Sequence, residues 1–198
     1  IQNLLAKYNV PLVGWVSDKQ GLLVKCHDTY YPEVPMQYCQ FHFLSHLWNH
    51  LECYDSNIFM PLKTTISNLY IRTSSQKVYY EGKGKIEVKE AFKDMNDEFQ
   101  DMISVRNKKF KTLRGVWLYE TLSNYLEGLI ETVNSMNPNL RGTIQMRGCY
   151  DAIHEVHSRL YPIYQNTVQL LKWFESIRSS LSNAKISVDT QETICIST

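Results

Sequence analysis

The spacing of apolar residues constrains the fold more than any other feature of the sequence. From Phe41 to about residue 184, apolar side chains recur every three or four positions, which is the period of a helix with one buried face. Pro162 interrupts the last such stretch, and an interior proline removes a backbone hydrogen bond. The pattern predicts helices at 41–54, 57–73, 86–105, 116–136, 148–161 and 163–184.

Residues 1–45 differ, because they carry the pattern of a strand–helix–strand unit. A short, nearly continuous apolar run at 12–16 is typical of a strand covered on both faces. A helix is predicted at 19–31 and a second short strand at 36–40. Such a unit favours parallel pairing of the strands through a right-handed crossover. The expected fold is therefore a small α/β piece with a pair of short parallel strands, followed by a large all-α region.

The chain accordingly divides into three predicted regions. The α/β piece occupies 1–45, the all-helical region 46–184, and a tail at 185–198 either begins a returning strand or is partly disordered. This order is unusual for a self-contained α/β domain, in which strands and helices alternate. It suits an α+β protein or an α/β domain that is interrupted by a helical insertion.

The composition is that of a globular protein. Of the 198 residues, 43% are hydrophobic and 21% are charged, so a sizeable core can form. The net charge of +1 gives no general attraction for nucleic acid, and any contact with DNA would need a local basic patch. No apolar run approaches the roughly 20 residues that span a bilayer, and the five cysteines form no disulfide framework. We therefore expect reduced thiols, a cytoplasmic location and no membrane partner.

Asp18 follows the first predicted strand and has two interpretations. A carboxylate at the carboxyl end of a strand can bind Mg²⁺ together with a second carboxylate. The alternative is that Asp18 caps the next helix, since aspartate is among the preferred residues at that position. On the local sequence alone, the helix cap is the more common case.

Cys39 and His42 form a Cys-x-x-His motif, whose spacing suits one half of a zinc site. His154 and His157 lie three positions apart on a predicted helix and are the candidates for the other half. The alternative is that Cys39 and His42 are packed or hydrogen-bonded core residues, since a buried cysteine behaves as a small hydrophobe and a lone histidine is often satisfied by a backbone carbonyl.

A basic stretch with one aromatic residue occupies 106–114 (RNKKFKTLR). Its cations could follow a phosphate backbone, while Phe110 stacks on a base or packs against the protein. The alternative is a solvated linker between two helices. The candidate DNA-binding residues are Arg106, Lys108, Lys109, Lys111 and Arg114.

Two stretches of the α/β region resemble a known family. They are residues 16–20 (VSDKQ) and residues 31–44 (YPEVPMQYCQFHFL). In order and spacing they are similar to DDE-type transposases of bacterial and archaeal insertion sequences, in the group related to Mutator-like enzymes. Those families have Ser-Asp at a strand end and, further along, P-x-x-P-H-Q-x-C-Q-x-H-F-L. The resemblance covers residues 10–50, and beyond it the helical stretch is alike only in kind, as an insertion in an RNase H-like core.

The resemblance implies a function and roles for single residues. Asp18 would be the second carboxylate of an Asp-Asp-Glu triad that binds two Mg²⁺ or Mn²⁺ ions for DNA cleavage and strand transfer. Cys39 and His42 would support the fold beside the active site, and in some relatives a later histidine pair completes a zinc site. Region 1–45 would be part of the RNase H-like catalytic core. The protein would act on transposon ends, as a homo-oligomer, in the nucleoid of a prokaryotic cytoplasm.

The sequence also departs from the family pattern. Met36 stands where a histidine is common. The strand with the first aspartate would precede Ile1, and nothing in 185–198 resembles the stretch that carries the final glutamate. Because one carboxylate cannot hold two metal ions, we expect the isolated chain not to cut or join DNA.

Alternatives from other classes stay open. The chain could be a helical binding or scaffold protein with a small α/β cap, in which Asp18 caps a helix and the Cys-x-x-His motif is packing. It could also be a zinc-stabilised DNA-binding module that uses Cys39, His42, His154 and His157 together with the basic stretch. Elemental analysis for bound zinc would distinguish the zinc module from the other interpretations.

Overall fold

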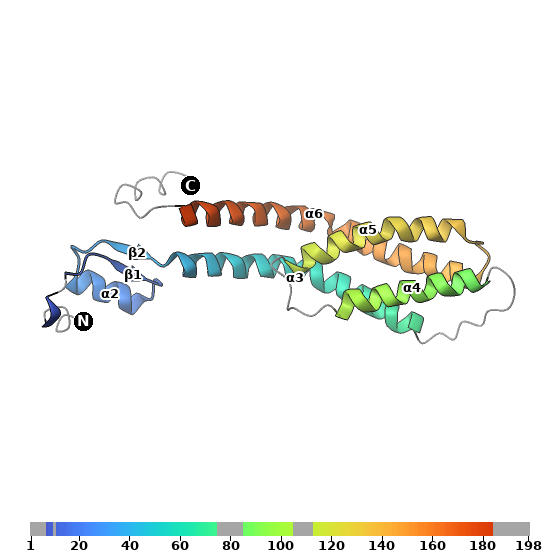
Figure 1. Cartoon of the computed structure of the whole chain (residues 1–198), viewed down its shortest axis with the longest axis horizontal. Helices are drawn as coiled ribbons and strands as arrows, with labels where there is room; N and C mark the ends of the chain where they lie inside the picture. Colours follow the sequence, from blue (N-terminus) through green and yellow to red (C-terminus); the bar gives the residue numbers. More distant parts are fainter. Residues whose placement is uncertain (1–6, 10, 75–84, 105–112, 184–198) are drawn as a thin grey trace. The chain divides into compact units, whose positions relative to one another are not determined.

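The computed structural model describes residues 7–9, 11–74, 85–104 and 113–183. In this part the chain is predominantly helical, with one pair of short strands (Figure 1). The mainly helical fold and the strand–helix–strand unit predicted from the sequence are thereby confirmed. The elements are β1 (Trp15–Ser17), α2 (Gly21–Tyr30), β2 (Met36–Tyr38), α3 (Gln40–Ser74), α4 (Lys85–Ser104), α5 (Arg114–Ser135) and α6 (Arg141–Asn183).

The chain divides into two compact units. The α/β unit comprises residues 1–50 and 174–198, and the helical unit comprises residues 51–173. Helices α3 and α6 each contribute residues to both units. None of the helices in the described part has the length and apolar character of a bilayer-spanning segment.

In the α/β unit, β1 and β2 form a two-stranded parallel sheet, as predicted. The register pairs Trp15 with Met36 and Ser17 with Tyr38. Helix α2 packs against this sheet through aromatic contacts, since the His27 ring centroid lies 6.0 Å from that of Trp15. Side chains alternate across a strand. Ser17 is accordingly buried, whereas its neighbour Val16 is 70% exposed on the other face.

His27 is a buried polar residue that ties α2 to the loop before β2. Its Nε2 lies 2.7 Å from the carbonyl oxygen of Val34, and its Nδ1 lies 2.9 Å from Oδ1 of Asp28. Both ring nitrogens therefore face oxygen acceptors, which favours the doubly protonated imidazolium. The hydrogen bond to Asp28 and then that to Val34 raise the pKa of His27 above its ordinary value.

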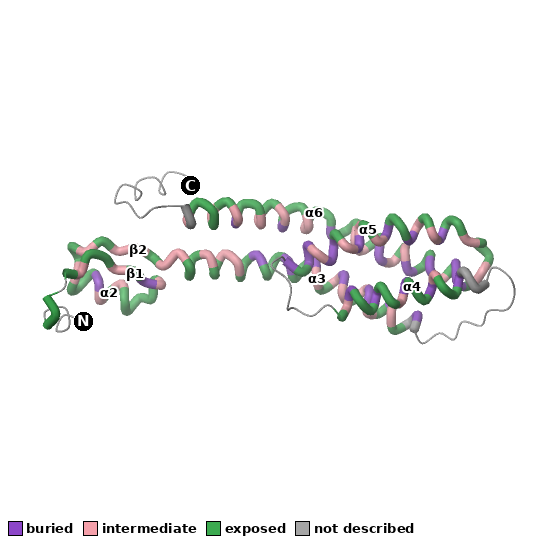
Figure 2. The backbone as a smooth tube through the Cα atoms, viewed as in Figure 1, coloured by how far each residue is buried: buried purple, intermediate pink, exposed green. Residues whose placement is uncertain are grey.

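The helical unit packs residues of α3, α4, α5 and α6 around one apolar core, and Figure 2 shows the buried positions recurring along each of these helices. The buried positions follow the helical period that the sequence displays. Each such side chain contributes about 1.5–3 kcal/mol when it is fully buried. The most completely buried core residues include Ile58, Leu62, Ile66, Met95, Phe99, Leu118, Leu122, Val133, Met146 and Ile153.

Two helix breaks predicted from the sequence do not occur. The predicted breaks lie between residues 54 and 57 and at Pro162, but α3 is continuous from Gln40 to Ser74 and α6 from Arg141 to Asn183. Helix α3 also runs through Pro61, as the helix predicted at 57–73 does. A proline in a helix interior costs about 3 kcal/mol. Beside Pro61, however, Ile58 and Leu62 are fully buried on the core face of α3. Since each of them contributes about 1.5–3 kcal/mol there, continued packing outweighs the proline.

Asp55 on α3 fixes the first turn of α5. Its carboxylate accepts hydrogen bonds from the backbone N–H groups of Gly115 (2.7 Å) and Val116 (2.9 Å). The carboxyl is buried, and desolvation raises its pKa while these N–H donors lower it. A side chain at position 115 would collide with the backbone carbonyl oxygen of Asp55, so glycine permits the close approach of α5 to α3.

Candidate active site

Asp18 and Cys39 directly follow the two strands of the α/β unit. Because β1 and β2 are parallel, their carboxyl ends lie at the same edge of the sheet. The Cys39 N–H donates to the carbonyl oxygen of Ser17 at 2.6 Å, which carries the ladder up to the residue before Asp18. In open α/β sheets, ligands bind outside the carboxyl ends of the strands. Topology alone therefore brings the two motifs of the sequence to one place.

The backbone around Asp18 forms a tight turn. Asp18 Oδ1 accepts a hydrogen bond from the Gln20 N–H at 3.2 Å, and Ser17 Oγ accepts one from the Lys19 N–H at 3.2 Å. Lys19 has a φ of 68°, in the left-handed region that residues other than glycine seldom adopt. The N-cap of α2 is Gln20. The prediction that Asp18 caps α2 is therefore wrong. The Asp18 carboxylate stabilises the turn that precedes the N-cap residue Gln20.

Cys39 lies immediately before α3, and His42 lies in the first turn of that helix. The Cys39 carbonyl accepts the Phe43 N–H at 3.1 Å, which begins the helical hydrogen bonds. The backbone N–H of His42, and next the His42 side chain, lower the pKa of the Cys39 thiol. Helix N-termini favour thiolates in this way. Cys39 is half-buried and interacts with His42, which leaves the hydrogen-bonded form of the alternative interpretation open.

His42 connects the two motifs across the sheet edge. Its Nε2 lies 3.8 Å from Oδ2 of Asp18, and the two side chains are 50% and 22% exposed. The distance is longer than a hydrogen bond and corresponds to an ion pair when the imidazole is protonated. Further along the same helix, His46 follows His42 with ring centroids 6.5 Å apart. The site thus pairs the Asp18 carboxylate with the His42 imidazole, and the Cys39 thiol interacts with His42 rather than with Asp18.

His154 and His157, the other half of the predicted zinc site, lie on α6 in the helical unit. His157 Nε2 is 2.8 Å from Ser123 Oγ, and its ring stacks on Tyr119 with centroids 3.9 Å apart. Desolvation lowers the pKa of His157. His154 stacks instead on Tyr150 at 5.4 Å. Over the residues that the structure describes, no three His, Cys, Asp or Glu side chains gather as a metal site. The zinc site stays a prediction.

Most of the predicted DNA-binding stretch lies outside the described residues, namely Arg106, Lys108, Lys109 and Lys111. Arg114 is described and is the first residue of α5. Its guanidinium carbon lies 5.8 Å from the centroid of the Phe59 ring, a cation–π contact within the helical unit. The DNA-binding role of the stretch therefore stays a prediction as well.

The sequence interpretation missed the neighbours of the site. Lys19 Nζ lies 5.3 Å from the centroid of the Tyr38 ring, and Phe41 meets the His42 ring edge-on at 6.3 Å. Both aromatic side chains are exposed, at 48% for Tyr38 and 76% for Phe41. The sequence did hold one signal. Tyr38 and Phe41 lie close together at the end of a short strand, where both rings are difficult to bury at once.

Comparison with known proteins adds no family to this description. None of the family models, curated proteins or solved structures compared with the chain matches it. The interpretation of the site therefore rests on the residues themselves: a carboxylate at the end of one strand, and a Cys-x-x-His motif that follows its parallel partner.

Proposed function

We propose that this chain is the central segment of a DNA transposase, with part of an RNase H-like catalytic core followed by a helical insertion. The observation that carries the proposal is the contact between Asp18 and His42, 3.8 Å from Nε2 to Oδ2. It joins the Ser-Asp motif to the Cys-x-x-His motif at the carboxyl edge of two parallel strands. Both motifs belong to the resemblance, and their proximity supports treating them as one site.

The local structure also supports a role for Asp18 beyond helix capping. The N-cap of α2 is Gln20, and only Oδ1 of Asp18 is engaged with the backbone of the turn, at Gln20. The second oxygen, Oδ2, lies 3.8 Å from His42 Nε2, and the Asp18 side chain as a whole is 22% exposed. A partly exposed carboxylate at a strand end suits metal binding.

Mg²⁺ or Mn²⁺ fits this donor set in part. Both ions prefer oxygen ligands, and Mg²⁺ commonly takes one or two carboxylates together with waters and substrate phosphates. Asp18 offers one such oxygen, whereas His42 and Cys39 offer nitrogen and sulfur and suit softer metals. Bound there, the ion would supply Lewis-acid activation of water or a 3′-hydroxyl for attack on a DNA phosphodiester. His42 and Cys39 act as supports that hold the two strand ends together.

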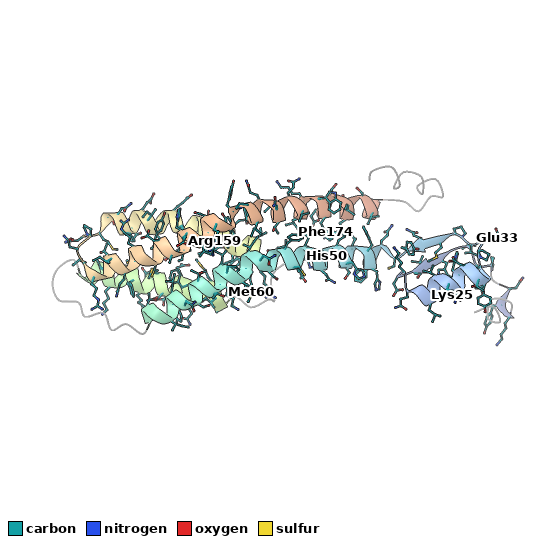
Figure 3. The ribbon with its side chains drawn as sticks, turned by 180° about the vertical axis from the view of Figure 1, so that it is seen from behind. Lys25, Glu33, His50, Met60, Arg159 and Phe174 are labelled. Carbon is teal, nitrogen blue, oxygen red and sulfur yellow. The ribbon has the colours of Figure 1, made fainter. Side chains whose placement is uncertain are left out.

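The metal site is tested by adding substoichiometric Mn²⁺ to the ¹⁵N-labelled chain and following paramagnetic broadening by NMR. The amide resonances of Ser17, Lys19 and Cys39 should broaden first, and Asp18→Asn should remove this selectivity. Glu33→Gln is the matched control, because Glu33 is an exposed carboxylate that precedes β2 instead of following a strand (Figure 3). Broadening that is unchanged in Asp18→Asn, or that centres on other carboxylates, would contradict the proposal.

A further inference from the structure

Two exposed aromatic side chains flank the candidate active site. Tyr38 ends β2 and is 48% exposed, and Phe41 lies in the first turn of α3 and is 76% exposed. Lys19, which follows Asp18, has its Nζ 5.3 Å from the centroid of the Tyr38 ring. The Phe41 ring contacts His42, and His42 lies 3.8 Å from Asp18. Lys19 thus joins the Tyr38 ring to the residue after Asp18, and His42 joins the Phe41 ring to Asp18 itself.

The backbone conformation of Lys19 is a second sign of a functional surface. Its φ of 68° lies in the left-handed region, where a side chain with a Cβ atom is strained. Such outliers in residues other than glycine cluster at active sites and ligand contacts. Here the strained residue presents a flexible cation over an exposed ring, directly beside the candidate catalytic carboxylate.

This combination of groups fits an unpaired nucleic acid strand. An exposed aromatic ring offers a face on which a base can stack, and a lysine beside it can contact phosphate. In a duplex the base faces are already stacked, so only an unpaired strand presents them. A protein surface is a poorer fit, because covering Phe41 would also desolvate Lys19 and Asp18 at a cost in free energy.

We propose that Lys19, Tyr38 and Phe41 form a binding platform for an unpaired DNA strand next to Asp18. The proposal rests on the function proposed above, since the platform would hold the strand whose phosphodiester reacts at Asp18. Tyr38 and Phe41 each offer a ring on which a base stacks, and Lys19, beside the Tyr38 ring, contacts a phosphate of the same strand. The three residues are binding residues and do not take part in bond making or breaking.

Binding is tested with the whole chain by fluorescence anisotropy of a fluorescein-labelled oligothymidylate roughly 12 nucleotides long. The buffer contains EDTA and little salt, so neither metal binding nor cleavage affects the result. Tyr38→Ala and Phe41→Ala should each weaken binding about five-fold or more, as expected for the loss of one stacked base. Tyr38→Phe keeps the ring and should bind as the wild type does. Lys19→Ala should weaken binding and reduce its salt dependence.

Matched controls separate the platform from general surface effects. Tyr30 is 60% exposed and Lys25 is exposed, and both lie on α2, away from the strand ends that carry Asp18. Tyr30→Ala and Lys25→Ala should leave the affinity unchanged. Asp18→Asn should tighten binding modestly, because it removes a charge that repels phosphate. Circular dichroism confirms that each variant is folded.

Several results would overturn the platform. These are no measurable binding of the oligothymidylate, equal losses in Tyr30→Ala and Tyr38→Ala, and a blunt DNA duplex or an RNA strand of the same length that binds as tightly. The test is independent of the metal site. If Asp18 fails to bind Mn²⁺ while Tyr38→Ala still weakens binding, the catalytic function is lost and the platform remains.

Discussion

His42 Nε2 lies 3.8 Å from Oδ2 of Asp18, although the two residues come from separate motifs of the sequence. The contact exists because β1 and β2 are parallel, so the residues that follow them emerge at one sheet edge. At this distance the imidazole is too far away for a hydrogen bond, so it does not use up the lone pairs of Oδ2. The turn therefore orients the Asp18 carboxylate while its side chain stays 22% exposed.

Cys39 should react faster with iodoacetamide than an ordinary thiol does, because the N–H and the side chain of His42 lower its pKa. In His42→Ala the midpoint of the alkylation rate against pH should rise only in part, since the backbone N–H of residue 42, the larger cause, remains. Mass spectrometry gives the rate at each cysteine, with the exposed Cys53 as the internal comparison. An unchanged midpoint in His42→Ala would show that the ring does not act on the thiol.

Asp55→Ala should destabilise the helical unit by about 2–4 kcal/mol, because two buried N–H groups lose a charged acceptor. Asp55→Asn, which keeps one carbonyl oxygen, should lose less. Urea unfolding followed by far-UV circular dichroism measures the difference. Asp97→Ala, at an exposed aspartate on α4, should stay within about 0.5 kcal/mol of the wild type. If the two alanine variants were equally stable, Asp55 would not anchor α5.

Gly115→Ala and Gly128→Ala should have opposite effects, although both glycines lie on α5. At position 115 the new Cβ meets the backbone of Asp55, so we expect a loss of about 1–3 kcal/mol in the free energy of unfolding. At position 128 no atom lies within 4 Å, and alanine should gain about 0.5–1 kcal/mol from helix propensity. The same urea titration measures both, and a loss at position 128 would be inconsistent with the open space seen there.

Local patterns predicted the elements of this fold but not its long-range contacts. The strand–helix–strand unit and the buried helical faces follow from apolar spacing, and the parallel pairing follows from the crossover. The continuity of α3 across residues 55–56 was missed, because it depends on how deeply the neighbouring Leu51 and Ile58 are buried, which no local pattern gives. The Asp55–Gly115 contact joins residues far apart in the chain.

For the candidate site, the sequence likewise predicted the residues but not their detailed geometry. Asp18, Cys39 and His42 could be named from the sequence, and their meeting follows from parallel strands. The left-handed backbone of Lys19 could not be predicted, because neither glycine nor asparagine marks the position. The exposed rings of Tyr38 and Phe41 were also missed, since apolar residues are expected to be buried.

His27 should make the α/β unit more stable in mild acid. Its pKa is raised in the folded state above 6.5, so the stabilisation is fully present below that pH and is lost as the pH rises through the folded value. Between about pH 6 and pH 8 the wild type should therefore lose more stability than His27→Gln. Urea unfolding followed by the Trp15 indole NMR signal reports this unit. His50→Gln, at an exposed histidine of the same unit (Figure 3), is the control. A parallel pH dependence in His27→Gln and wild type would refute the assignment.

The most direct test of the central claim is the anomalous scattering of Mn²⁺ in crystals of the chain grown with the ion. We predict an anomalous peak about 2.0–2.2 Å from a carboxylate oxygen of Asp18, at the edge that Cys39 and His42 share. The peak should be absent from Asp18→Asn crystals grown in the same way and present in Glu33→Gln crystals. Mn²⁺ peaks at other carboxylates with none at Asp18 would contradict the account.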